Sequence, residues 1–406
     1  MVSASGTRNI GQWRLGADFL PGDGCTANSI RGEWGLTGPV EPISKGQYFL
    51  MAAMSVVAGA IYIWPQYIIQ TAGINGLWSL FTTAGISLLV LSLQIAWVSL
   101  TKATPFATAV RNTWGVFGMW LVVSITGILC MTIDGVMLAL FGQMLHVFFY
   151  PLTPEAVPIV LIGLAGIWIA MRSLSTVARN VQFWFPLILL SFGFVVSLSL
   201  RSVRFSAALL PSPTFVVPQW LRATLSTWFL YANGAVVASL IPHIRWTGRP
   251  RPVLWTTWAV GFQTLVLVLV FVIVVTTLGP AAASQLQWPM VYVFSLVSVK
   301  TFFFKGVGMF VIITWTTAVV LYLSVHIYCF SWNVQAMVDA SSLARRWFAL
   351  GAGIVVITIA ILIPSAISAG KILFGVLNPA DLSWTLGVAL LSVFVVWIRH
   401  RRSKHS

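Results

Sequence analysis

The chain has 406 residues, of which 58% are hydrophobic and only 8% are charged, with a mean hydropathy of +0.92. This balance excludes a soluble domain and predicts an all-α polytopic membrane protein. The formal net charge of +15 would favour nucleic acid in a soluble protein, but here the basic residues fall mostly in short loops. We therefore expect them to set membrane topology and to contact anionic lipid, and we expect no nucleic-acid partner.

The first 46 residues are polar and glycine-rich, without the apolar core or cleavage site of a signal peptide. We interpret residues 1–46 as a cytoplasmic tail, residues 47–398 as a single membrane domain, and residues 399–406 as a basic cytoplasmic C-terminus. The three cysteines have no metal-ligand spacing and imply no disulfide framework.

Ten apolar segments are long enough, or nearly so, to cross the hydrocarbon core as helices. They lie at about 47–69, 74–98, 116–149, 157–171, 181–200, 217–244, 254–278, 306–330, 347–364 and 382–398. With the N-terminus inside, most of the 23 Lys and Arg residues fall in inside segments. This bias favours ten spans with both termini in the cytoplasm.

The first span contains Ala58-Gly59 and, six residues after Gly59, Pro65. Glycine weakens a helix and proline removes a backbone donor, so this span is expected to break between them. The alternative is that these residues only bend the helix, as they commonly do in membranes. Freed backbone groups are tolerated in hydrocarbon only where they face protein or a water-filled cavity. A break here therefore indicates a small-molecule site.

The sixth span repeats this pattern, because Tyr231, Asn233 and Gly234 are followed by Pro242. Five spans in each half make spans 1 and 6 antiparallel. We predict two inverted five-helix repeats, about 47–200 and 217–398, with broken helices 1 and 6. Between spans 7 and 8, residues 285–304 are too interrupted to cross and favour a re-entrant or interfacial helix.

Among the eight acidic residues, only Asp134 is expected deep in the membrane, midway along span 3. Such a carboxylate is a functional candidate unless it is neutral and hydrogen-bonded for packing alone. It is either protonated or faces water, an ammonium group or a cation. The seven other acidic residues, Asp381 among them, are expected in the tail, in loops or at span ends.

Span 8 carries a polar face that includes Thr314, Thr317, Tyr322, Ser324 and His326. Serine and threonine in membrane helices often bond their own preceding carbonyls, and a structural histidine is common, so each residue alone has an ordinary explanation. As a group they could line a cavity opposite the breaks. The expected ligand contacts are Ala58, Gly59, Tyr62, Asp134, Tyr231, Asn233, Gly234 and Thr314. No catalytic motif, metal site or cofactor site is evident, so we do not expect an enzyme.

Several stretches resemble the spore-germination permease family, the B-subunit type of nutrient germinant receptors, within the amino acid–polyamine–organocation transporter superfamily. The similar stretches are Ile43-Ser44 with Gln47, Gly59 and Pro65; Ala72-Gly73 with Trp78; Arg179 with Phe185-Pro186; and Pro289 with Phe310 and Trp315. The resemblance implies two inverted five-helix repeats. It also implies a sensor of a nutrient such as an amino acid in the spore inner membrane, beside A-type and C-type subunits.

The chain departs from that family just before span 8. The family often has an acidic–basic pair and a further Asp there, whereas this chain has Phe304-Lys305 and Gly308. The alternatives to a receptor subunit are a proton- or cation-coupled amino-acid transporter on the same scaffold and a purely structural membrane protein.

Overall fold

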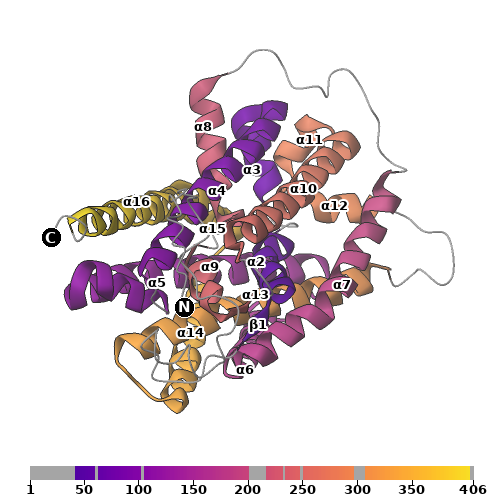
Figure 1. The fold of residues 1–406 in the computed structure, drawn as a ribbon. Coiled ribbons are helices and arrows are strands. Elements are labelled where there is room, and N and C mark those ends of the chain that lie inside the picture. Colours follow the sequence, from indigo (N-terminus) through magenta and orange to yellow (C-terminus); the bar gives the residue numbers. More distant parts are fainter. Residues whose placement is uncertain are drawn as a thin grey trace, which may run out of the picture.

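The structure is a computed structural model, which describes residues 42–59, 63–101, 105–200, 216–231, 234–246, 250–296 and 307–402. The predicted breakpoint residues Tyr62 and Asn233, and most of the polar tail, lie outside these ranges. The described chain is a bundle of helices with one two-residue strand pair (Figure 1).

The first half of the chain contains the predicted spans 1 to 5. Its elements are β1 (Ile43–Ser44), α2 (Lys45–Gly59), α3 (Trp64–Ala72), η1 (Gly73–Asn75), α4 (Gly76–Thr101), α5 (Phe106–Phe148), α6 (Ala156–Ala170) and α7 (Leu174–Ser199). Helix α5 bends at Gly115, whose φ of 76° lies in the left-handed region that glycine adopts without a Cβ penalty. The bend lies one residue before the predicted start of span 3, and α5 begins ten residues before that start.

The second half contains the predicted spans 6 to 10. Its elements are α8 (Val217–Ser226), η4 (Trp228–Leu230), α9 (Gly234–Leu240), η5 (Ile241–His243), β2 (Ile244–Arg245), α10 (Pro252–Leu278), α11 (Pro280–Gln285), α12 (Pro289–Leu296), α13 (Val307–Met337), α14 (Ser342–Leu362), α15 (Ala366–Ile372), η7 (Leu373–Leu377) and α16 (Asn378–Arg402). The short helices α11 and α12 agree with the prediction that the segment between spans 7 and 8 does not cross the membrane.

Seven helical stretches of the described chain are long and apolar enough to cross a membrane. The other three predicted spans are the 15-residue α6 and the two interrupted spans, whose parts are each too short to cross alone. The protein is therefore an all-α, multi-pass integral membrane protein, as the sequence predicts.

Spans 1 and 6 run antiparallel. Strands β1 and β2 are parallel, and Ile43 pairs with Ile244. Because α2 leaves β1 whereas α9 and η5 lead into β2, the start of span 1 and the end of span 6 lie together. At the other end, α3 packs against α8. This is the arrangement expected for inverted repeats with broken first helices.

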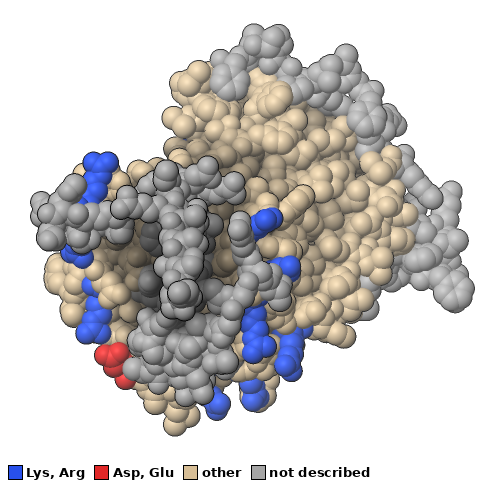
Figure 2. Space-filling model, viewed as in Figure 1, with Lys and Arg blue, Asp and Glu red and all other residues tan. Residues whose placement is uncertain are grey.

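Close helix contacts in the bundle depend on small residues. A Cβ added to Gly142 would overlap Ile159 of α6, and one added to Gly353 of α14 would overlap Ile167 of α6. Membrane helices associate largely through such close packing, because lipid is as apolar as the side chains themselves. Figure 2 shows Lys and Arg gathered on the side of α6, α14 and β1, whereas the surface over α10 and α11 is uncharged.

Candidate functional site

Span 1 is interrupted where the sequence predicts. Helix α2 ends at the buried Gly59, and α3 begins at Trp64 with Pro65 in its first turn, where the missing N–H costs no helical hydrogen bond. Ala58 lies in the last turn of α2, with its side chain outside the description. The break thus separates two half-helices, and residues 60–62 between them are not described.

Span 6 is interrupted between Ser226 and Gly234. Helix α8 ends at Ser226, a short 3-10 turn follows, and α9 begins at Gly234. Tyr231 is fully buried just before the second half-helix. Its hydroxyl donates to Thr264 Oγ1 of α10 at 3.2 Å and lies 3.4 Å from the Leu80 carbonyl oxygen of α4.

Polar side chains from α4 and α16 satisfy the groups freed at this interruption. Asn378 Nδ2 donates to the Ser226 carbonyl at 2.7 Å, and Thr83 Oγ1 donates to the Thr224 carbonyl at 3.0 Å. The Trp228 indole N–H donates to Asp381 Oδ2 at 2.6 Å. A helix end inside a membrane requires partners of this kind.

Asp381 lies at the start of α16, as predicted for a residue at a span end, but it is buried beside the interruption of span 6. Helix α16 begins at Asn378, four residues earlier than expected, and Asp381 is only 5% exposed in its first turn. The predicted start was late because the apolar run begins after Asp381, whereas the helix begins before it. The spacing of Asn378, Asp381 and Trp384 at three-residue intervals places them on one helix face and could have revealed this polar face.

Asp134 is completely buried and contacts two side chains of α13. The Tyr322 hydroxyl donates to Asp134 Oδ1 at 2.6 Å, and His326 Nδ1 lies 3.0 Å from the same oxygen. Tyr322 and His326 are one turn apart, so they present one face to α5. The sequence places both in span 8 but does not reveal that they meet a carboxylate on span 3.

Thr314 lies at a different contact of α13. Its hydroxyl donates to Ser191 Oγ of α7 at 2.8 Å, beside a cavity of about 10 Å³ that Phe192, Val266 and Trp315 help to line. Thr317 and Ser324 bond preceding carbonyls of their own helix, which is the ordinary explanation considered above. Asp134, Tyr231 and Thr314 thus lie at three separate helix contacts, and their joint role in a ligand site stays a prediction.

A larger cavity, of about 30 Å³, lies between α5, α9 and α13. Among its lining residues are Thr126, Cys130, Val236, His326 and Asn333. One water needs about 10–15 Å³, so the space fits about two waters. Because Val236 is the third residue of α9, this cavity adjoins the interrupted part of span 6.

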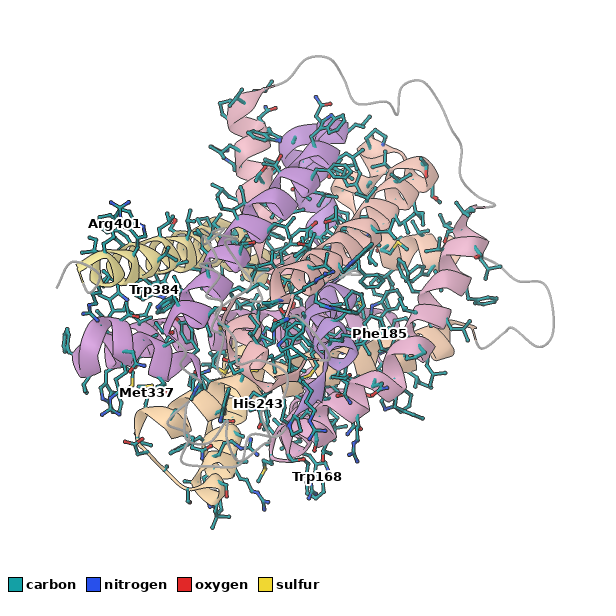
Figure 3. All side chains as sticks on the ribbon, in the orientation of Figure 1. Trp168, Phe185, His243, Met337, Trp384 and Arg401 are labelled. Atoms are coloured by element: carbon teal, nitrogen blue, oxygen red, sulfur yellow. The ribbon has the colours of Figure 1, made fainter. Side chains whose placement is uncertain are left out.

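Helix α16 also contacts α5 beside this cavity. The Trp384 indole N–H, labelled in Figure 3, donates to Thr126 Oγ1 at 2.9 Å. Cys130 lies within electrostatic range of both Asp134 and Asp381. Within the described ranges, no group of three His, Cys, Asp or Glu residues could hold a metal ion.

Comparison with known families identifies the group to which this architecture belongs. A family profile described as "Spore germination protein" (spore permease) matches residues 42–369. The chain belongs to the spore germination protein family. The match runs from the residue before β1 to Ala369 within α15 and includes both interrupted spans.

Solved structures similar to this spore germination protein share its fold at low sequence identity. MhsT, solved in complex with L-phenylalanine, is 15% identical, with a TM-score of 0.66 over 88% of this chain and 89% of that one. Mhp1, a nucleobase-cation-symport-1 family transporter in a closed conformation with bromovinylhydantoin bound, is 14% identical, with a TM-score of 0.57 over 88% and 80%. Among proteins with curated descriptions, none matches the sequence.

Proposed function

We propose that this protein is the permease-like subunit of a nutrient germinant receptor, which binds a small nutrient such as an amino acid to trigger spore germination. The observation that carries the proposal is the pair of matched interruptions, at Gly59–Trp64 and Ser226–Gly234, in antiparallel spans of a spore germination family member. Paired interruptions of this kind are where transporter folds bind substrate.

The proposed ligand is a small zwitterion. Backbone N–H groups at the start of α3 have no helical partners and favour a carboxylate. Carbonyl groups at the ends of α2 and α8 favour an ammonium group, although side chains already occupy part of the α8 end. The side chains proposed to complete the site are Ala58, Tyr62, Asp134, Tyr231, Asn233 and Thr314. Ligands of MhsT and Mhp1 are small molecules of comparable size, which supports a nutrient of this class.

Signalling requires that the nutrient bind one arrangement of the bundle more tightly than another. We propose that this difference reaches A-type and C-type partner subunits in the spore inner membrane, with both termini of this chain in the cytoplasm. The gathering of basic residues at the β1, α6 and α14 end supports that orientation, because cytoplasmic loops carry an excess of Lys and Arg (Figure 2).

The test uses spores that carry Gly59→Leu or Gly234→Leu. Each amino acid of a panel is added separately, and germination is measured as the fall in optical density. Either leucine side chain would occupy the space beside a half-helix end, so we expect the nutrient response to be lost while the protein stays in the membrane. Gly261→Leu is the matched control, because Gly261 is exposed on α10 and nothing lies within 4 Å of an added Cβ. Unchanged responses to every amino acid in both variants would reject the proposed site.

The second candidate is a proton- or cation-coupled amino-acid transporter, favoured by the transporter fold and by the buried Asp134–His326 contact. Uptake of labelled amino acids into proteoliposomes separates the two functions. Sustained accumulation that is driven by an ion gradient supports the transporter, whereas binding without accumulation supports the receptor.

A further inference from the structure

We propose that Asp134 and His326 form a proton-binding site. At neutral pH, the pair holds one proton more than a carboxylate beside a neutral imidazole would hold. The proposal goes beyond nutrient binding and applies to the protein before a ligand reaches Asp134. It rests on three observations: the direct contact of the two groups, their complete or near-complete burial, and a small cavity that reaches one of them.

The contact between Asp134 and His326 is compatible with only a few protonation states of the two side chains. Asp134 Oδ1 receives the Tyr322 hydroxyl proton at 2.6 Å and lies 3.0 Å from His326 Nδ1. No described group donates a hydrogen bond to Oδ2. With a carboxylate and a neutral imidazole, the pair would carry a net negative charge in an apolar interior, with one oxygen unpaired. Burying such a charge is strongly unfavourable.

One added proton removes this charge. It makes either an imidazolium that donates from Nδ1 to the carboxylate or a carboxylic acid whose O–H on Oδ1 donates to Nδ1 of a neutral imidazole. Both forms have a net charge of zero, and the same proton interconverts them by moving between the two residues. A buried ion pair or neutral pair is much less costly than an isolated buried charge.

Among the described residues, no Lys or Arg forms an ion pair with Asp134 that could replace this proton. Cys130 on α5 and Cys329 on α13 are the other titratable groups near the pair, with Tyr322, and Asp381 on α16 is another acid within electrostatic range of His326. The described helices α6 and α9 contain no charged residue. On α14, Arg345 and Arg346 lie at the start of the helix, and Arg345 Nη1 donates to the Ala170 carbonyl.

The cavity provides a route for the proton. His326 lines the space of about 30 Å³ between α5, α9 and α13, which fits about two waters beside the polar side chains of Thr126 and Asn333. A proton carried by water in that space reaches the imidazole before it reaches Asp134, whose side chain is 0% exposed.

The pair also connects the two repeats, since α5 belongs to the first and α13 to the second. If the helices separate, a protonated pair can part as a carboxylic acid and a neutral imidazole. An unprotonated pair would leave a lone carboxylate in the core. The bound proton is therefore a condition for movement of α5 against α13.

The experiment is NMR of the full chain in lipid nanodiscs, with ¹⁵N-labelled histidine and ¹³C-labelled aspartate. The chain has five histidines, so the ring signals are few, and His326→Gln assigns the relevant one. At about pH 8, an ordinary imidazole with a pKa of about 6.5 is almost entirely neutral. We expect either an imidazolium signal from His326 or a carboxylic-acid signal from Asp134 at that pH. In Asp134→Asn, the His326 ring should become fully neutral.

His146→Gln is the matched control, because His146 contacts the Thr153 carbonyl rather than a carboxylate. Its loss should leave the signal of the pair unchanged. If a variant fails to fold, titration of the wild-type protein still decides, since two groups that share a proton titrate together in coupled steps. A neutral His326 ring together with an ionised Asp134 at neutral pH would overturn the proposal.

Discussion

The hydrogen bond between Trp228 and Asp381 offers a direct test of how the interruption in span 6 is stabilised. Trp228→Phe removes the indole N–H that donates to Asp381 Oδ2 at 2.6 Å. Trp64→Phe is the matched control in span 1. Trp64 is equally buried, at 0% exposed, but its Nε1 has no hydrogen-bond partner among the described residues.

Both substitutions remove the same ring volume, so the difference between them isolates the hydrogen bond. A neutral hydrogen bond contributes about 0.5–1.5 kcal/mol and a bond to a charged group about 1.5–3 kcal/mol. We expect Trp228→Phe to lower the free energy of unfolding by about 2 kcal/mol more than Trp64→Phe. This corresponds to a factor of about 30 in the unfolding equilibrium constant.

The assay is reversible unfolding in mixed micelles with an increasing fraction of SDS, followed by circular dichroism. Asp381→Asn is a second check, because its side-chain oxygen can still accept from the indole. It should therefore cost less than Trp228→Phe. Equal losses of stability in Trp228→Phe and Trp64→Phe would show that the Asp381 contact does not stabilise the interrupted helix.

Two further predictions use the same unfolding assay. Gly353→Ala should lower the free energy of unfolding by about 1–3 kcal/mol, because the added Cβ overlaps Ile167. Gly351→Ala should be neutral or slightly stabilising, because nothing lies within 4 Å of the Cβ added there. Equal effects of the two substitutions would contradict the packing argument. Arg345→Met should cost about 2–3 kcal/mol, because Arg345 donates to the Ala170 and Arg172 carbonyls at the end of α6. Arg346→Met, at an exposed position, should change stability by less than about 0.5 kcal/mol, and a comparable loss there would reject the capping role.

Contacts between arginine and tryptophan at the surface are a further kind of contact, which the sequence predicts only in general terms. The Arg172 guanidinium lies 4.2 Å from the centre of the Trp168 ring at the end of α6, and Arg401 stacks similarly on Trp397 at the end of α16 (Figure 3). Tryptophan and basic residues are both enriched at membrane interfaces. Their pairing depends on which helix face reaches the surface, which the structure shows.

Sequence alone predicted the membrane class, the ten spans and the interruption of spans 1 and 6. These features depend on local properties: the length of an apolar run, the missing N–H of Pro65, and the weak helix propensity of Gly59 and Gly234. Because each can be evaluated within a single segment, the predicted break of span 1 between Gly59 and Pro65 agrees with the structure, whereas the interruption of span 6 lies before Gly234 and not between Gly234 and Pro242.

Only the tertiary structure determined which polar side chains meet. Asp134 and Tyr322 are 188 residues apart, and Trp228 and Asp381 are 153 residues apart. Each contact depends on the rotation and tilt of two helices about their axes, and nearly uniform apolar sequences specify these only weakly. The burial of Asp381 and the pairing of Asp134 with His326 therefore follow from helix packing across the two repeats, not from either segment alone.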